Sequence, residues 1–263
     1  SVDLGFVGRR DEGLAAVQEA TAIRRQLAKD DPTYLPDLAD SLNNLSVDLG
    51  FVGRRDEGLA AVQEATAIRR QLAKDDPDTY FPGLADSLNN LSDQLGDSGR
   101  RDEGLAAVQE ATAIRRQLAK DDPDTYLPGL ASSLNNLSVD LGDAGRQDES
   151  LAAAQEATAI RRQLAKDDPD TYLPGLASSL NNLSVDLGEV GRQDESLAAA
   201  QEATAIRRQL AKDDPDTYLP ALATALNNLS MRLGEVGRQD ESLAAAQEAT
   251  AIRRQLAKDD LVT

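Results

Sequence analysis

The chain of 263 residues contains no cysteine, no histidine and no tryptophan. The absence of cysteine excludes disulfide bonds, thiolate zinc clusters and thiol chemistry. The absence of histidine removes the commonest general base and the commonest ligand of transition metals. Most classes of enzyme depend on one of these groups, so we expect a protein with no catalytic residues, no metal site and no cofactor.

Aromatic residues make up only 3% of the chain, so a buried core must be built from leucine, alanine, isoleucine and valine. No apolar run approaches the ~20 residues that a membrane-spanning helix needs. No signal peptide precedes the first repeat, and the chain begins without methionine, part-way through a repeat unit. We therefore expect a cytoplasmic segment cut from a longer protein.

Acidic residues outnumber basic ones, and the formal net charge is −18. A negative surface disfavours nucleic-acid binding, which needs basic groups, and it disfavours adhesion to anionic lipid. We therefore expect neither nucleic acid nor a membrane as a partner. The charge either keeps an elongated surface soluble or selects cationic partners, and the composition leaves both open.

The motif Leu-Asn-Asn-Leu-Ser occurs five times at intervals of 46 residues. A fixed period of this length is typical of a solenoid, in which stacked repeats build one continuous core. We expect one array over residues 1–263, with a partial unit at 1–33 and full units from about 34, 79, 125, 171 and 217. Within the partial unit, residues 1–5 match the end of a first helix, and a complete helix is predicted over residues 11–29.

Each full unit contains two apolar patterns with helical spacing, as the fourth unit illustrates. Leucines at intervals of 4, 3 and 4 residues predict a first helix over residues 172–188 with one apolar face. These leucines are Leu176, Leu180, Leu183 and Leu187. A second helix is predicted from Asp194 to Lys212, with acids in its first turn and a lysine in its last, as the helix dipole favours. Its apolar face consists of Leu197, Ala200, Ala203, Ile206 and Leu210.

Turn-forming residues separate the two helices. Residues 168–171 are predicted to form a loop in which Asp170 or Thr171 caps the following helix. Pro174 is then expected in the first turn of that helix, where its missing N–H costs nothing. Gly191 is predicted to end the first helix in a left-handed conformation.

Differences between the units fall at a few sites, among them three on the first helix. In the fourth unit these are Ser178, Val185 and Glu189, which lie 7 and 4 residues apart on one helix face, away from the leucines. The equivalent residues are Asp40, Val47 and Phe51; Asp86, Asp93 and Asp97; Ser132, Val139 and Asp143; and Thr224, Met231 and Glu235. The changes therefore mark one face that is separate from the predicted core.

Several residues of the fourth unit follow a known pattern: Leu180-Asn181-Asn182-Leu183, Leu187, Gly191-Arg192, Glu195, Ala203 and Ile206-Arg207. This pattern resembles a tetratricopeptide repeat, in the longer form found in kinesin light chains and in bacterial multidomain regulators. The resemblance covers essentially the whole chain. The period of 46 residues exceeds the usual period of about 34, which we attribute to an extra turn in each first helix and a longer second helix.

The resemblance implies an all-α fold, an α-solenoid of antiparallel helix pairs that form a right-handed superhelix, with the first helices lining a concave groove. In such proteins the groove binds an extended peptide or the surface of a partner, and the second asparagine often hydrogen-bonds to the ligand backbone. In this chain that role would fall to Asn44, Asn90, Asn136, Asn182 and Asn228. Further partner-binding residues in the groove would be Asn89, Asn135, Asn181, Val139, Val185, Asp143, Glu189 and Glu235.

An asparagine side chain carries both a donor and an acceptor, so a ladder of asparagines can match the peptide groups of an extended ligand. The alternative is that one asparagine of each pair hydrogen-bonds to a neighbouring helix. The sequence leaves both interpretations open.

Other recurring charged residues are interpreted as structural. Arg207 falls near the apolar face, so we expect its stem to pack and its guanidinium to pair with an acid of the next unit. Asp167, Asp168 and Asp170 are expected to cap helices and not to bind a cation, because the spacing of a calcium loop is absent.

These features predict a protein-interaction scaffold that holds a protein or peptide in a repeated groove. Because the groove carries Asp97, Asp143, Glu189 and Glu235, we expect a neutral or basic partner. The alternative is a self-assembling or spacer module that associates through the ends of the array and has no dedicated ligand. The near identity of the units favours either an engineered array or a recent duplication, between which the sequence does not decide.

Overall fold

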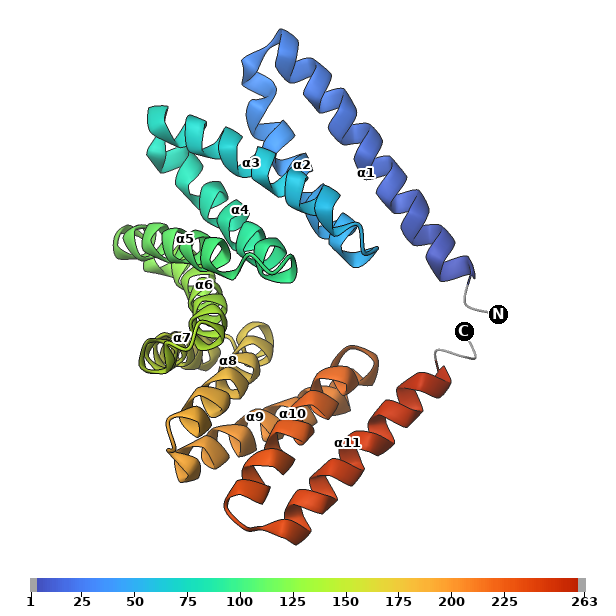
Figure 1. Cartoon of the computed structure of the whole chain (residues 1–263), viewed down its shortest axis with the longest axis vertical. Helices are drawn as coiled ribbons and strands as arrows, with labels where there is room; N and C mark the ends of the chain where they lie inside the picture. The colour runs from blue at the N-terminus through green and yellow to red at the C-terminus, as the bar shows by residue number, and fades with distance from the viewer. Residues whose placement is uncertain (1–3, 260–263) are drawn as a thin grey trace. The chain divides into compact units, whose positions relative to one another are not determined.

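A computed structural model of the chain describes the backbone of residues 4–259 and the side chains of residues 13–258. Every regular element in this part of the chain is a helix (Figure 1). The elements are α1 (Leu4–Asp30), η1 (Pro32–Tyr34), α2 (Leu35–Phe51), α3 (Arg55–Asp75), α4 (Pro77–Asp97), α5 (Arg101–Asp121), α6 (Pro123–Asp143), α7 (Gln147–Asp167), α8 (Pro169–Glu189), α9 (Gln193–Asp213), α10 (Pro215–Glu235) and α11 (Gln239–Asp259). The chain divides into two compact units, residues 1–140 (unit 1) and residues 141–263 (unit 2).

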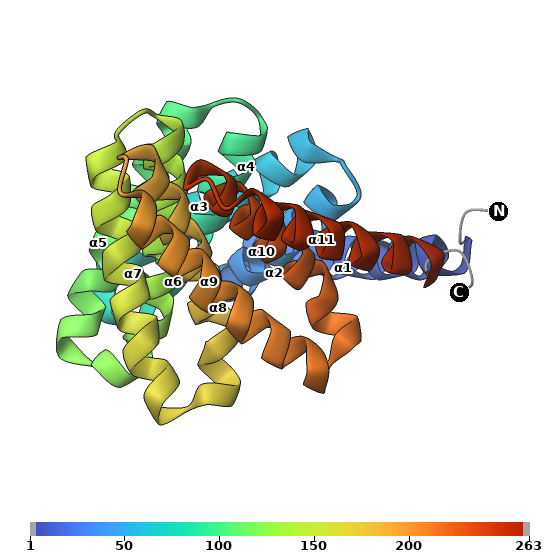
Figure 2. The same ribbon diagram turned by 90° about the horizontal axis from the view of Figure 1, so that it is seen from below.

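Successive helices pack against each other within each unit. In unit 1, α2 packs on α3, α3 on α4 and α4 on α5, and the first helices α2 and α4 also touch. In unit 2, α7 packs on α8, α8 on α9, α9 on α10 and α10 on α11, and the first helices α8 and α10 also touch (Figure 2). The predicted all-α solenoid of helix pairs with a period of 46 residues is therefore confirmed.

The first leucine of each Leu-Asn-Asn-Leu-Ser motif lies at the centre of the core. Leu88 in unit 1 is 0% exposed, and Leu180 in unit 2 is 1% exposed. Ala111 and Ala203 on the second helices are fully buried, and their small side chains let neighbouring helices approach closely. Burial of each leucine is worth about 2 kcal/mol, so every stacked helix adds to the stability of the core.

The first helices end at a glycine with a left-handed conformation, as predicted. Gly191 has a φ of 79°, a conformation that glycine adopts without strain. The N–H of Arg192 donates to the carbonyl of Leu187 at 2.8 Å, and the N–H of Gly191 donates to the carbonyl of Gly188 at 3.1 Å. This pair of hydrogen bonds is a Schellman motif, which satisfies carbonyls that the helix end would otherwise leave unpaired. The equivalent positive-φ glycines are Gly53, Gly99, Gly145 and Gly237.

The start of the first helices differs from the prediction. Helix α8 begins at Pro169, so the residues predicted as a loop form its first turn. Asp168 is the cap, because its carboxylate accepts a hydrogen bond from the Thr171 N–H at 3.2 Å. The predicted loop was wrong, because proline at the first helical position costs no hydrogen bond and the helix can begin at Pro169. Pro174 consequently lies inside the helix and not in its first turn.

The N-terminal region also differs from the prediction. Helix α1 is continuous from Leu4 to Asp30, with no turn ahead of residue 11, and residues 1–3 of the predicted helix end lie outside the described residues. The few residues there are too short to form an antiparallel partner for α1, so nothing stabilises a turn. The next linker is one aspartate shorter than its equivalents, and it forms η1 before α2 begins at Leu35.

Candidate partner-binding surface

Four positions on each first helix form a row outside the leucine face, which we call the stripe. On α8 the stripe consists of Ser178, Asn182, Val185 and Glu189, at intervals of 4, 3 and 4 residues. The equivalent stripes are Asp40, Asn44, Val47 and Phe51 on α2; Asp86, Asn90, Asp93 and Asp97 on α4; Ser132, Asn136, Val139 and Asp143 on α6; and Thr224, Asn228, Met231 and Glu235 on α10. Three of the four positions of each stripe vary between the repeats, and the second asparagine of the motif is constant.

The C-terminal halves of the stripes carry apolar residues, acidic residues or one of each. Phe51 is 78% exposed, Met231 is 54% exposed and Val139 is 50% exposed, whereas Val185 is partly buried. The acidic residues at the end of the stripes are also exposed: Asp97, Asp143, Glu189 and Glu235.

The second asparagines of the motif differ in exposure from one stripe to the next. Asn44 is exposed, Asn90, Asn136 and Asn182 are partly buried, and Asn228 is only 7% exposed. The Nδ2 of Asn228 donates to Oδ1 of Asn181 at 3.0 Å, and its Oδ1 accepts from Nε of Arg232 at 3.3 Å. Both polar atoms of Asn228 are therefore used within the protein.

The first asparagines of the motif lie between neighbouring first helices. Asn89 on α4 is 8% exposed, and its Nδ2 donates to Oγ of Ser133 on α6 at 2.9 Å. Asn135 is equally buried, and Asn181 accepts the hydrogen bond from Asn228. For Asn89 and Asn181 the structure thus shows the alternative left open by the sequence, in which one asparagine holds a neighbouring helix. Contact between either asparagine and a partner stays a prediction.

Arg232 is a residue of the stripe region that the sequence interpretation did not single out. It stands where the other first helices carry Asp48, Gln94, Asp140 and Asp186. Its guanidinium donates to the Glu235 carboxylate at 3.0 Å, so this predicted acidic site is already paired. The guanidinium also packs over Gly188 of α8, where an added Cβ would lie 2.1 Å from Nη1. A basic residue at a position otherwise held by aspartate or glutamine was the signal that could have identified it.

Asp93 carries the most perturbed charge on the stripes. It stands on α4 at a position that is apolar on the other first helices. Neighbouring groups desolvate its carboxyl, and the charges of Asp140 and Asp97 repel it, so its pKa is raised to about 6. The Asp93 carboxylate accepts a weak hydrogen bond from Nδ2 of Asn136 at 3.5 Å.

The recurring Arg-Arg pair of the second helices has two separate roles. The first arginine reaches between two first helices. Arg69 donates to the carbonyl of Gly83 at 2.5 Å and to Oγ of Ser87 at 2.6 Å, both on α4. It also pairs with Asp40 on α2, the first helix of its own repeat. Likewise Arg207 donates to Oγ of Ser178 at 3.0 Å. The prediction that Arg207 pairs with an acid of the next repeat was therefore wrong.

The second arginine of the pair makes the predicted bridge to the following repeat. Arg208 pairs with Glu248 at 2.5 Å, and Arg25 pairs with Glu64 at 2.6 Å. Consecutive residues of a helix are about 100° apart, so one arginine faces the first helices and its neighbour faces the surface of the second helices.

The described part of the chain contains neither a metal-binding cluster nor a membrane-spanning helix. No group of three or more acidic side chains there could hold a metal ion. None of the described helices has a segment both long and apolar enough to cross a membrane. Of the three linker aspartates, Asp168 caps α8, whereas Asp167 is the last residue of α7 and Asp170 lies in the first turn of α8.

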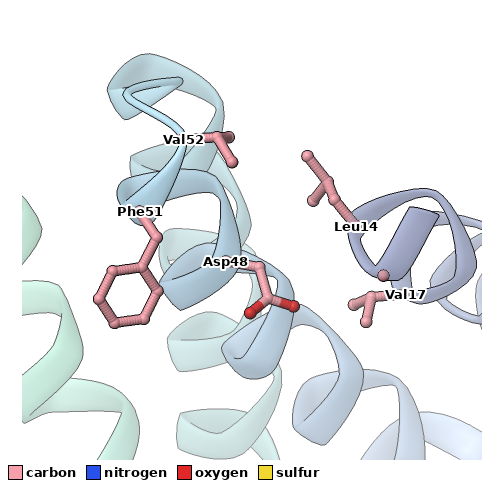
Figure 3. Close-up of a pocket in the computed structure, with 6 residues that line it drawn as sticks. Leu14, Val17, Asp48, Phe51 and Val52 are labelled. Atoms are coloured by element: carbon pink, nitrogen blue, oxygen red, sulfur yellow. The ribbon is translucent and has the colours of Figure 1, made fainter. Parts of the chain in front are cut away.

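A pocket of about 400 Å³ lies between α1 and α2 in unit 1. Leu14 and Val17 of α1 line one side, and Asp48 and Val52 of α2 line the other. Phe51 also belongs to the lining, but its ring points away from Leu14 and Val17 (Figure 3). The sequence marked Phe51 as a variable site but gave no sign of the pocket, because the pocket depends on how α1 packs. A second pocket of about 430 Å³ in unit 2 is lined by residues of α9, α10 and α11, including Arg208 and Glu248.

The geometry defines the class of protein: an α-solenoid whose core is separate from an exposed variable face. The family model described as tetratricopeptide repeat matches residues 38–78, 84–124, 130–170, 176–216 and 222–260. These matches cover more than half of the chain, which therefore belongs to the tetratricopeptide repeat family. The family fold is generally a non-enzymatic scaffold for protein–protein interaction.

Solved structures agree with this assignment. BtubC (BKLC) from P. vanneervenii is similar, with a TM-score of 0.73 and 20% identity, over 94% of this chain and 92% of that one. A protein of Podosopora anserina, described as a kinesin light chain with nearly identical TPR-like repeats, has a TM-score of 0.62 and 14% identity, over 84% of this chain and 97% of that one. At these identities the similarity shows the fold alone. No curated protein sequence matches the chain.

Proposed function

We propose that the protein is a scaffold that binds a neutral or basic peptide, or such a segment of a partner protein, along the stripes of its first helices. The observation that carries this proposal is the position of the variable sites. Three variable sites of each first helix lie on its stripe, whereas the leucine face is the same in every repeat. A constant frame that carries a varied exposed face is suited to reading a ligand.

Charge supports a neutral or basic ligand. Glu189 is exposed on the stripe of α8, and Asp97 lies 3.9 Å from Arg55, a long contact that solvent screens. A cationic ligand would gain from such carboxylates, mainly in specificity and association rate.

Charge reversal tests the proposal. We expect Asp143→Lys with Glu189→Lys to weaken binding of a labelled 20-residue peptide of alternating lysine and serine about tenfold, measured by fluorescence anisotropy. The matched control is Asp167→Lys with Asp213→Lys, which makes the same change of charge at exposed ends of second helices, where a cation suits the helix dipole. Equal affinity for the wild type and both variants would contradict the proposal.

A self-associating module is the second candidate. Leu243 of α11 is 59% exposed, whereas the equivalent Leu197 of α9 is only 7% exposed, because α10 covers it. The apolar face of α11 could therefore receive another helix. Light scattering over a range of concentrations tests this candidate: a mass that rises for the wild type but not for Leu243→Ser would support it, and a constant monomer mass would exclude it.

A further inference from the structure

The first arginine of the recurring Arg-Arg pair has a different partner in each unit. In unit 1, Arg115 on α5 pairs with Asp86 on α4, the first helix of its own repeat. In unit 2, Ser178 stands at the position of that aspartate, and its Oγ accepts a hydrogen bond from Nη2 of Arg207 at 3.0 Å. A neutral hydroxyl has therefore replaced the carboxylate that balances the guanidinium charge in unit 1.

The helix that follows Arg207 has lost two further partners. In unit 1 the equivalent Arg69 donates to a glycine carbonyl and to a serine hydroxyl on α4. On α10 these two positions are Ala221 and Ala225, so the hydroxyl is absent. A Cβ added to the glycine, Gly83, would lie 3.1 Å from Nε of Arg69, so alanine at this position crowds the place that the guanidinium takes in unit 1.

The guanidinium of Arg207 is left without a counter-ion. Among the described residues no ion pair is found for it, and its hydrogen bond to Ser178 is the only one found there. Desolvation lowers the pKa of both Arg115 and Arg207, but the charge of Asp86 offsets part of this shift for Arg115 alone. A partly buried charge without a partner is costly, so this place favours an anion.

The place of the missing carboxylate opens to solvent. In unit 1 the side chain of Asp86 is 58% exposed, although that of Arg115, with which it pairs, is only 12% exposed. Ser178 and Arg207 are partly buried at the equivalent positions of α8 and α9. A carboxylate from outside the protein can therefore approach Arg207 from the side on which Asp86 meets Arg115.

The acidic end of the same stripe sets a spacing for the ligand. Ser178 and Glu189 lie at opposite ends of the stripe of α8. With a rise of about 1.5 Å per residue, they are about 16 Å apart along the helix. An extended peptide covers about 3.3 Å per residue, so groups about five residues apart can reach both ends.

We propose that Arg207 binds the carboxylate of an aspartate or glutamate in a partner peptide, about five residues from a lysine or arginine that contacts Glu189. This inference rests on the proposed function and adds an acidic residue, at a defined spacing, to the ligand. In unit 1, Asp40 and Asp86 already occupy the equivalent places from within the protein.

Two matched labelled peptides test the inference. Both consist of glycine and serine around three central lysines, and one carries a glutamate about five residues from the middle lysine on each side, where the other carries glutamine. A glutamate on each side makes the test independent of the direction in which the peptide binds. The affinity of each peptide for the whole chain is measured by fluorescence anisotropy.

We expect the wild type to bind the glutamate peptide about fivefold more tightly than the glutamine peptide, through a charge pair that is partly shielded from solvent. The net charge of the chain, −18, would by itself favour the glutamine peptide. A preference for glutamate therefore requires a local cationic site.

Two variants locate that site. Ser178→Asp supplies from within the carboxylate that unit 1 has, and Arg207→Gln removes the cation, so each should abolish the preference for glutamate. Ser178→Asp reproduces an arrangement found in unit 1, so it keeps the test decisive if Arg207→Gln does not fold, which far-ultraviolet circular dichroism checks. The matched control is Lys212→Gln, which removes the same charge from the exposed end of α9 and should leave the preference within about twofold.

The outcomes separate this inference from the proposed function. If the wild type binds both peptides equally, or prefers glutamine, the inference fails, whereas the scaffold function stands as long as replacement of the lysines by serines abolishes binding. If the preference for glutamate persists in both Ser178→Asp and Arg207→Gln, the carboxylate binds elsewhere and the inference is wrong. If neither peptide binds, and the lysine–serine peptide does not bind either, both proposals fail.

Discussion

Units 1 and 2 solve the same packing problem, the close approach of a first helix to the second helix of its pair, in two ways. In unit 1 the contact is made at a glycine: a Cβ on Gly104 would lie 3.1 Å from the carbonyl oxygen of Ser92, and the Ser92 hydroxyl donates to the Gly104 carbonyl at 2.9 Å. In unit 2 a serine occupies the position, and Oγ of Ser196 donates to the Ser184 carbonyl at 2.6 Å. Between these two pairs the direction of the hydrogen bond is reversed, whereas Ser230 and Ser242 of unit 2 hydrogen-bond in both directions.

A compensating change accompanies this difference one turn along the second helix. Val62 and Val108 are fully buried in unit 1, where unit 2 has Ala154 and Ala200. Unit 1 has glycine at the first position and the larger valine four residues later, whereas unit 2 has serine followed by the smaller alanine. The comparison suggests that the two positions vary together because the space between the helices is shared, as close packing requires.

The largest expected effect concerns a position that the units have in common. Leu88→Ala and Leu180→Ala should each lower the free energy of unfolding by about 3 kcal/mol, because each removes a fully buried side chain and leaves a cavity. Urea denaturation followed by circular dichroism measures this. The control is Leu243→Ala on α11, which truncates an exposed leucine. It should lower the free energy of unfolding by less than about 0.5 kcal/mol. A large difference between Leu88→Ala and Leu180→Ala would show that the two cores are not equivalent.

The valine of unit 1 should have the next largest effect. Val108→Ala removes two buried methyl groups, and we expect a loss of about 2 kcal/mol in the free energy of unfolding. The reverse change in unit 2, Ala200→Val, should also destabilise, by about 1 kcal/mol, because that space is already occupied. A gain in stability from Ala200→Val would instead reveal an unfilled space in unit 2.

Exchange of the glycine tests whether the two positions are coupled. Gly104→Ser alone should cost about 1 kcal/mol, because the added Cβ lies against the Ser92 carbonyl. The double variant Gly104→Ser with Val108→Ala reproduces the pair found in unit 2, so its cost should be smaller than the sum of the two single costs by about 1 kcal/mol. Simple additivity in denaturation experiments would refute the idea of a shared space.

The smallest effect is a dependence on pH that only unit 1 should show. Asp93 has a folded-state pKa of about 6, above the value of about 3.9 for an unperturbed aspartate. Between these two pH values the folded protein holds the proton more tightly than the unfolded chain, so this site lowers the stability of the wild type as the pH rises from about 4 to about 6. The loss is then complete above pH 6.

Asp93→Asn should therefore be more stable than the wild type at pH 7, by at most about 1 kcal/mol because solvent screens an exposed carboxylate, and nearly equal to it at pH 4. Asp93→Val, which introduces the residue of α6 and α8, should behave in the same direction. Thermal unfolding at the two pH values measures the difference. The same stabilisation at both values would contradict a titrating Asp93 as its cause.

Features with a local or periodic signal could be predicted from the sequence. The period, the leucine face and the left-handed Gly191 depend on spacing and on a conformation that only glycine favours. The start of α8 also has a local signal, Asp168 followed by Pro169, but residues 168–171 were predicted to form a loop. The candidate site was predicted in part: the stripe follows from helix geometry, whereas the engagement of Asn89 and Asn228 depends on neighbouring helices.

By itself, the sequence determined that this protein is a stack of helix pairs with a core of leucine and alanine, because helical spacing decides which residues can share a face. Only the tertiary structure decided which of two adjacent groups faces a neighbouring helix, as with Arg207 and Arg208. It also decided that α1 is continuous, that Arg232 neutralises Glu235, and that a pocket opens beside Phe51. The reason is physical: periodicity fixes directions within one helix, whereas pairing, burial and empty space depend on the distance between helices.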